Sequence, residues 1–282
     1  MKKRFILCCL IIFLICLFID STYVLSSIIS YTDLFIRNLF PFLLLIFTVS
    51  SMLIDYGLLE LLPPTLYVIF LSFVSGFPSS AKYSVSLYKD NYLDDNNALC
   101  LVRNCHYPNP LFLFGSISSV ISKNSCFIIF ISLIITSIIG LLVDGIRIKS
   151  LRIQKENKSF LKSFTDSFWN SISTIVLIYG TSVFSFCIAN IIIRNIRISG
   201  ILYCLIYGLF DLTKGIFSTT LLINKKIREI LILLFISMGS ISIHMQVAEI
   251  LRGTKLSYSK YLIARIRNTI TCFIIYIILC SL

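Results

Sequence analysis

Charged side chains are scarce in this chain of 282 residues, in which Asp, Glu, Lys and Arg together make up 13% of the sequence. Hydrophobic residues make up 57%, which is far more than one soluble core can use. Such a composition excludes an ordinary soluble domain and is typical of a polytopic membrane protein. Lipid is therefore the expected solvent for most of the chain.

The sequence also lacks the common catalytic and nucleotide-binding motifs. It contains no GxSxG, no HExxH and no Walker loop, and it lacks the pair of intramembrane acids that an aspartyl intramembrane protease needs. We therefore expect no enzymatic activity, no catalytic residues and no cofactor. Because an energy-coupling nucleotide site is missing, a secondary carrier or a channel is the expected class.

Disulfide and metal patterns are missing too. The ten cysteines form no CxxC pair and lie mostly within apolar runs, which indicates small packed core residues. The two histidines, His106 and His244, have no ligand partner at helical spacing, so we expect no metal site. Each histidine fits either a hydrogen-bonded structural role or a proton-coupled role.

Basic residues outnumber acidic ones, giving a formal net charge of +12. They lie mainly between apolar runs and form no face that alternates with aromatics, which favours orientation against an anionic leaflet over nucleic-acid binding. Lys2-Lys3-Arg4 precedes the apolar run Phe5 to Ile19 without a cleavage site, which predicts a retained span with a cytoplasmic N-terminus. Residues 144–165 form the densest basic stretch and are predicted to be a cytoplasmic connector. Its basic residues include Arg147, Lys149, Arg152, Lys155, Lys158 and Lys162.

Apolar runs of about 20 residues, the length that crosses ~30 Å of hydrocarbon, predict the membrane spans. After the first span these runs are Phe35–Ile54, Cys100–Ile121, Phe127–Val143, Phe168–Ile193, Ile230–Ile250 and Leu262–Leu282. Two shorter runs, Leu66–Val74 and Ile201–Phe210, each end at a polar break and predict re-entrant helical hairpins. Hairpins that cross fully remain the alternative, and they would change the topology.

The order of these runs predicts an all-α polytopic membrane protein with two inverted repeats. Residues 1–30 form an N-terminal transmembrane helix, 31–143 a first gate-like repeat and 166–282 a second one, on either side of the connector. Each repeat contains transmembrane helices and a re-entrant hairpin. Inverted repeats of this kind build alternating-access transporters, with the solute site near the midplane.

Polar breaks interrupt the apolar sequence at Ser75–Lys82 and at Phe210–Gly215. Freed backbone groups are costly in hydrocarbon unless protein or water satisfies them, so matching breaks indicate a polar cavity. Helix ends carry free N–H groups, and with Lys82 and Lys214 they predict an anion site. Snorkelling of both lysines to an interface is the alternative. Asp211 fits either a proton-carrying role or a structural pair with Lys214.

A second pair of polar segments contains the two histidines. Residues 103–110 hold His106 and Asn109 between prolines, and residues 238–246 alternate polar with apolar positions, which is the period of extended backbone. We therefore expect partial unwinding in both. The predicted substrate site consists of Ser75, Gly76, Pro78, Ser79, Lys82, His106, Asn109, Asp211, Lys214, Ser240, Ser242, His244 and Gln246.

Three patches carry a family resemblance. Ser75-Gly76-Phe77-Pro78 with Ala81-Lys82 is similar to SGYPxxAK, Asn109-Pro110-Leu111-Phe112 with Phe114-Gly115 is similar to NPLFxFG, and Ser242 to Val247 is similar to a late SIHxQV-like segment. In these patches the chain resembles the sporulation integral membrane proteins of the YlbJ type, within the nucleoside-recognition or gate-domain group. It departs from them at Ser79-Ser80 and at Cys105 to Pro108.

The resemblance implies a role in endospore formation and transport of dipicolinic acid, a small aromatic dianion. It implies a multi-pass protein of the cell membrane or a forespore membrane. The lipid bilayer and other spore-assembly membrane proteins would be its partners, besides the small anionic or aromatic solute. A nucleoside-type permease and a non-transporting scaffold in spore assembly remain the alternative functions.

Overall fold

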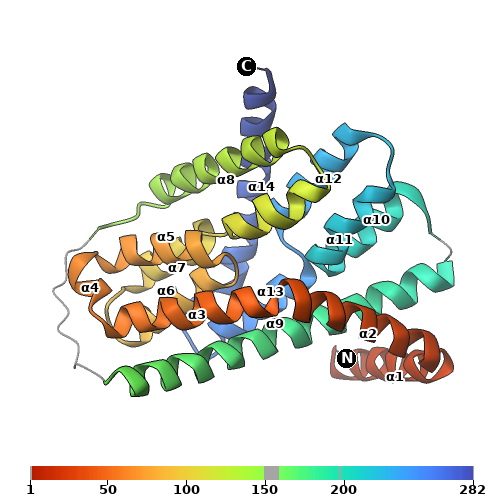
Figure 1. Ribbon diagram of the computed structural model, residues 1–282, viewed down its shortest axis with the longest axis horizontal. Coiled ribbons are helices and arrows are strands. Elements are labelled where there is room, and N and C mark those ends of the chain that lie inside the picture. The colour runs from red at the N-terminus through yellow and green to blue at the C-terminus, as the bar shows by residue number, and fades with distance from the viewer. Residues whose placement is uncertain (1, 149–158, 197, 282) are drawn as a thin grey trace.

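The computed structural model describes residues 2–148, 159–196 and 198–281, and all regular structure in these ranges is helical (Figure 1). This confirms the all-α prediction. Four helices are long and apolar enough to cross a membrane, and a bent pair at the N-terminus raises the number to five if it counts as one span. By helix length and hydropathy, the chain is a multi-span membrane protein. The four spans are Lys123–Val143, Phe160–Ile196, Tyr258–Ser281 and the segment Lys225–Leu251, which is interrupted at Gly239 and Ser240.

The N-terminal part is not one straight helix. Helix α1 (Lys2–Ile19) and helix α2 (Ser21–Asn38) meet at an angle of 94°. At the bend, the Asp20 carboxylate pairs with the Arg194 guanidinium at 2.8 Å, which ties this corner to the end of helix α9 (Phe160–Ile196). Most side chains of α1 are exposed large hydrophobics, as expected of a surface that faces lipid.

The single span predicted for residues 35–54 is wrong, because the chain breaks at Leu39. Helix α2 ends one residue before this position, and helix α3 (Phe40–Asp55) begins one residue after it. Pro41 lies in the first turn of α3, where its missing N–H costs nothing, whereas inside a continuous helix it would displace the carbonyl four residues earlier. Helix α3 packs along α9 at the bottom of Figure 1.

The rest of the chain runs through two series of helices. The first contains α4 (Leu58–Leu61), α5 (Pro64–Ser75), α6 (Ser79–Lys89), α7 (Asp95–Asn104), a π-helical turn (Phe112–Ser116), a 3₁₀ turn (Ile117–Ser119) and α8 (Lys123–Val143). The second contains α9, α10 (Gly200–Phe210), α11 (Leu212–Ser218), a 3₁₀ turn (Thr219–Leu221), α12 (Lys225–Met238), α13 (Ile241–Leu251) and α14 (Tyr258–Ser281). Both predicted breaks are present, between α5 and α6 and between α10 and α11.

Unwinding in the two histidine segments is unequal. Residues 105–109 are non-helical, as predicted, but in the later segment only Gly239 and Ser240 leave the helix. Gly239 has φ of +83°, a conformation that glycine adopts without steric cost, so this one residue accommodates the break. The prediction of extended backbone up to Gln246, which was based on the alternation, is wrong. In helix α13, Ser242 and Gln246 are buried four residues apart on one face.

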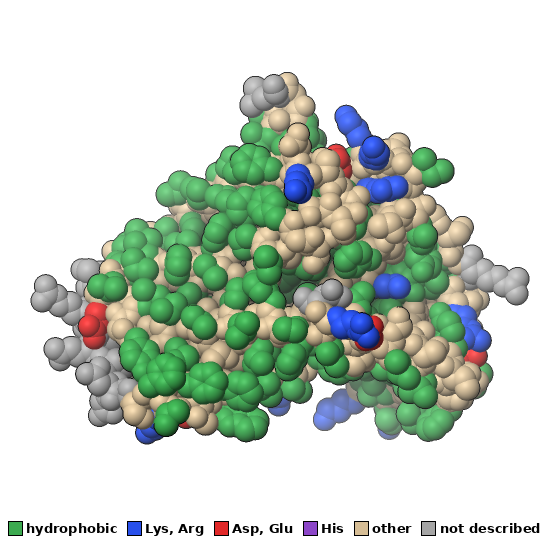
Figure 2. Space-filling model, viewed as in Figure 1, with side chains coloured by type: hydrophobic (Ala, Val, Ile, Leu, Met, Phe, Trp, Pro, Cys, Tyr) green, Lys and Arg blue, Asp and Glu red, His purple; other side chains and the backbone are tan. Residues whose placement is uncertain are grey.

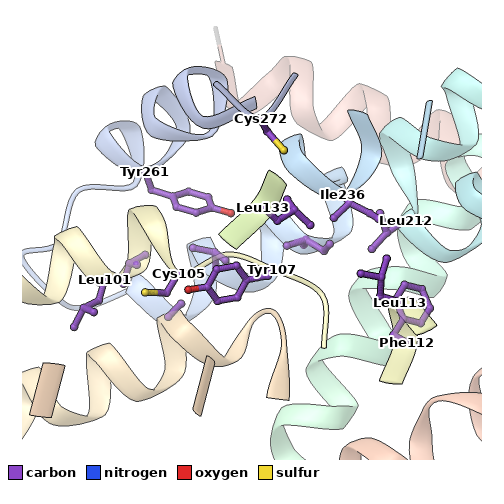
Figure 3. Packing of buried hydrophobic residues seen from close by; sticks show 14 of the residues in the cluster. Leu101, Cys105, Tyr107, Phe112, Leu113, Leu133, Leu212, Ile236, Tyr261 and Cys272 are labelled. Carbon is purple, nitrogen blue, oxygen red and sulfur yellow. The ribbon is translucent and has the colours of Figure 1, made fainter. Parts of the chain in front are cut away.

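The core joins the two series of helices. Helix α8 packs against α14, and Figure 3 shows Leu101, Tyr107 and Leu113 of the first series close to Tyr261, Ile236 and Leu212 of the second. Outside this core, apolar side chains cover most of the face shown in Figure 2. Such a surface fits lipid contact. The central part of the predicted basic connector, residues 149–158, lies outside the described residues.

Candidate functional site

Both predicted breaks contribute to the walls of one cavity of about 70 Å³. Phe77 and Asn109 come from the first series of helices, and Asp211 and Gln246 come from the second. Residues more than 100 positions apart in the sequence therefore meet at this site. The complete lining is Tyr31, Phe35, Leu39, Leu43, Phe77, Pro108, Asn109, Phe112, Ile178, Ser182, Asp211, Leu212, Thr213, Ser242, Ile243 and Gln246.

The first break is held by the non-helical segment 105–109. Gly76 has φ of +73°, and a Cβ added there would lie 2.5 Å from the backbone nitrogen of Asn109, so only glycine allows this approach. The Phe77 N–H donates to the Tyr107 carbonyl at 2.9 Å, and the Ser79 hydroxyl donates to the Gly76 carbonyl. Protein groups therefore satisfy the backbone that the break frees, as a membrane interior requires.

Of the other residues predicted at this break, Ser75 and Pro78 support the local structure. Ser75 is fully buried with its hydroxyl 3.3 Å from that of Ser50, and Pro78 precedes the first turn of α6. Neither of them lines the cavity, and Gly76 and Ser79 do not line it either. The first break therefore contributes Phe77 to the lining, and the non-helical segment contributes Pro108 and Asn109.

The second break places a carboxylate at the cavity. Asp211 has extended backbone, is 2% exposed, and accepts hydrogen bonds from the Tyr31 hydroxyl and from the backbone N–H of Lys214, both at 2.8 Å. The second contact caps helix α11. Asp211 is the one charged side chain among the described residues that line the cavity.

The two lysines expected at an anion site lie elsewhere. The Lys82 ammonium group donates to the Thr174 hydroxyl at 2.7 Å and lies 5.3 Å from the centre of the Phe47 ring. The Lys214 ammonium group lies 5.5 Å from the centre of the Tyr207 ring. Neither side chain lines the cavity. The contact between Asp211 and Lys214 is a helix cap through the backbone and not an ion pair.

Helix α13 supplies polar groups to the cavity from the other side. The Gln246 amide donates to the Thr181 hydroxyl of α9 at 3.0 Å, which orients its carbonyl end. The Ser240 and Ser242 hydroxyls are 2.7 Å apart, and of these two residues Ser242 lines the cavity. Across the cavity, the side-chain oxygen of Asn109 accepts a hydrogen bond from the backbone N–H of Phe112 at 2.6 Å. The side-chain nitrogen of Asn109 is left as a donor.

The two histidines lie together behind the cavity. The rings of His106 and His244 lie 5.9 and 5.7 Å from the ring of Tyr261, and the Tyr261 hydroxyl is 3.3 Å from His106 Nδ1. Phe77 stacks on His106 at 4.9 Å and separates it from the cavity. Within the described ranges no group of three His, Cys, Asp or Glu side chains is arranged to hold a metal ion.

A charged cluster lies at the end of helix α8. The Asp144 carboxylate accepts from Arg267 at 2.7 Å, from Asn104 at 2.6 Å and from Arg103 at 3.1 Å. Burial raises the pKa of Asp144, but hydrogen bonds from Arg267 and Asn104 and the charge of Arg103 outweigh burial, so this pKa lies below its ordinary value. Next to this cluster, Arg265 of α14 is 2% exposed and donates to the Arg103 carbonyl.

Sequence reasoning missed several of these residues. Tyr31 and Ser182 line the cavity without any local pattern that marks them, and Thr213 lies inside the predicted second break but was not assigned to the site. Arg265 did carry a signal, because an arginine inside the last apolar run is costly in a membrane and indicates a specific partner.

Comparisons with protein-family models, with curated proteins and with solved structures find no match to this chain. The functional assignment therefore depends on the site itself. Its cavity combines aromatic walls with one carboxylate and a few amide and hydroxyl groups, a combination suited to a small polar or aromatic solute.

Proposed function

We propose that the chain is a secondary transporter of a small anionic or aromatic solute, which binds in the cavity between the two helix breaks. The observation that carries this proposal is that Asn109 and Asp211, which belong to different series of helices, line the same cavity. A protein that only anchors partners has no need for two polar breaks facing one internal space. Interrupted helices around a central site are a recurrent feature of transporters.

We also propose that residues 31–143 and 166–282 are inverted repeats. The order of elements supports this, since α3 with the first series, and α9 with the rest of the second, each give a packed helix, a broken hairpin, an interrupted helix and a closing helix. Helices in equivalent positions contact one another, α3 with α9 and α8 with α14. Such a pairing is expected of two copies related by a pseudo-two-fold axis.

Dipicolinic acid is the solute that we propose, on the strength of the resemblance to the YlbJ-type sporulation proteins. Aromatic side chains of the cavity, Tyr31, Phe35, Phe77 and Phe112, suit a pyridine ring. We propose that the two halves move apart to load this solute into the cavity, as alternating access provides.

Asp211 gives this transport a requirement for a proton. An ionised carboxylate in the cavity wall repels a dianion, because like charges a few ångströms apart cost several kcal/mol, about 4 at an effective dielectric constant of 20. A proton on Asp211 removes the repulsion. We therefore propose that the solute moves together with a proton that Asp211 carries.

Uptake into proteoliposomes tests the proposed function. Wild-type protein is expected to take up radiolabelled dipicolinate, and Gln246→Ala to lower the initial rate about tenfold because the amide faces the solute. Asn195→Ala removes an exposed amide and is the matched control, with uptake expected at the wild-type rate. Uptake of a nucleoside in place of dipicolinate would select the permease alternative. The proposal would be contradicted by uptake of neither solute, or by equal initial uptake rates for Gln246→Ala and wild type.

A further inference from the structure

Arg265 is a buried cation without a counter-charge. Its guanidinium group donates to the Arg103 carbonyl and lies 5.6 Å from the centre of the Tyr261 ring, while its Nε has no acceptor. Within the described part of the chain, no carboxylate lies within ion-pair distance of it. A buried guanidinium with no anion beside it is strongly disfavoured, so this group calls for a negative partner.

The acidic residue of the neighbouring cluster is already used. Asp144 accepts from Arg103, Arg267 and Asn104, so its lone pairs are occupied. Three guanidinium groups and one carboxylate leave a formal excess of two positive charges. The Arg103 and Arg267 side chains are 23% and 33% exposed and reach water, whereas Arg265 does not.

Two imidazoles face a common space at Gly239. A Cβ placed on this glycine would lie 3.3 Å from His106 Nε2 and 3.7 Å from His244 Nε2, so both ring nitrogens face this glycine. His106 is 3% exposed and its Nε2 has no partner. When the Tyr261 hydroxyl donates to His106 Nδ1, the ring proton is on Nε2, which then is a buried donor without an acceptor.

The start of helix α13 adds to the same space. The helix begins at Ile241, directly after Gly239 and Ser240, and Ser240 makes no side-chain capping bond to it. Free N–H groups and the positive end of the helix dipole favour an anion at such a terminus.

We propose that Arg265, His106 and His244, with the start of α13, bind a small anion at Gly239. The ligand is a single compact negative group, either an inorganic anion such as chloride or one carboxylate of a larger solute. The site is separate from the cavity, because Phe77 stacks on His106 between the two. It therefore does not depend on the proposed transport function.

Thermal unfolding of the purified protein in detergent tests the site. In buffers of constant ionic strength, replacing gluconate by chloride or by formate is expected to raise the unfolding midpoint and then saturate, because a ligand that binds the folded state stabilises it. Arg265→Gln is expected to lose the saturable rise. Arg267→Gln removes a guanidinium that already has its carboxylate, and it is expected to keep the rise.

A second variant covers the case in which Arg265→Gln does not fold. His244→Phe removes one of the two imidazole nitrogens that face Gly239 and is expected to lose the rise as well. A rise with chloride identifies an inorganic anion, and a rise with dipicolinate alone that Arg265→Gln abolishes identifies a carboxylate of the solute. No saturable rise in the wild type, or an equal rise in Arg265→Gln, would overturn the proposal. If proteoliposomes take up no solute but the rise in the unfolding midpoint depends on Arg265, the proposed transport function is wrong and the anion site is still supported.

Discussion

Asp211 determines the charge of the cavity. It is buried beside the titratable Tyr31 phenol of α2 and follows α10, while the Lys214 ammonium group of α11 faces aromatic rings. The carboxylate therefore has no cationic side chain paired with it among the described residues. Its protonation state decides whether a dianion is repelled or accepted.

Uptake of dipicolinate by the wild type is expected to rise as the pH falls from the mildly alkaline to the mildly acidic range. The sign follows from charge, since a proton on Asp211 removes a negative group next to a negative solute. Asp211→Asn is neutral at every pH, so its uptake is expected to lose this dependence. Initial rates in proteoliposomes measure both.

Asp33→Asn is the control for this prediction. Asp33 is an exposed acid on the same helix as Tyr31 and pairs with Arg37, so its loss is expected to leave the pH profile unchanged. A wild-type pH profile in Asp211→Asn would contradict the role assigned to Asp211.

At the scale of residues, the sequence predicted four of the polar residues that line the cavity. Asn109, Asp211, Ser242 and Gln246 all follow from polar positions in apolar surroundings. The sequence did not predict that the Lys82 side chain lies away from the cavity. A break frees the backbone but does not determine which neighbour a long side chain contacts. Tyr31 was unpredictable for another reason. Its contact with Asp211 joins positions 180 residues apart and leaves no local pattern.

At the scale of elements, small residues allow the second hairpin to close. A Cβ on Gly215 would lie 2.2 Å from the Gly208 Cα, so helices α10 and α11 approach closer here than any side chain allows. Gly208 in turn lies against the ring of Phe235 on α12. The hairpin and the capping position of Asp211 therefore depend on Gly208 and Gly215, of which the sequence analysis named only Gly215, as the end of the second break.

Gly215→Ala is expected to destabilise the protein by about 2–4 kcal/mol, because the added methyl group meets backbone that cannot yield cheaply. Gly180→Ala is the matched control in helix α9. Nothing lies within 4 Å of the added methyl group there, and a change of at most about 1 kcal/mol in the stabilising direction is expected. Unfolding midpoints in detergent measure both, and equal midpoints would show that the hairpin does not close on these glycines.

Element boundaries show where pattern reading succeeds. Long apolar runs such as Phe127–Val143 correspond to helices, because the bilayer requires continuous backbone hydrogen bonding. The run Phe35–Ile54 did not correspond to one helix, since composition does not reveal the interruption at Leu39, two residues before Pro41. The alternation after Gly239 also misled, because polar positions in α13 meet α9 on one side and Tyr261 on another.

At the scale of the whole molecule, the proposed transport depends on one cavity that both series of helices line. The order of elements in each series was readable from the sequence, because each break separates two apolar runs. The convergence of both breaks on one space was a hypothesis that needed coordinates. Exposed apolar side chains around this assembly match a lipid surface, and the polar breaks are confined to its interior.

Alternating access to the cavity is the most direct test of this account. Ser242 is 1% exposed and lines the cavity, so Ser242→Cys places a thiol there. This substitution is made in a variant in which the exposed Cys8, Cys9 and Cys280 are replaced by serine. Labelling of that variant without the new thiol gives the background signal. A membrane-impermeant maleimide is applied to vesicles of each orientation. The account predicts labelling from both sides, slowed by dipicolinate on each, and labelling from one side only would contradict it.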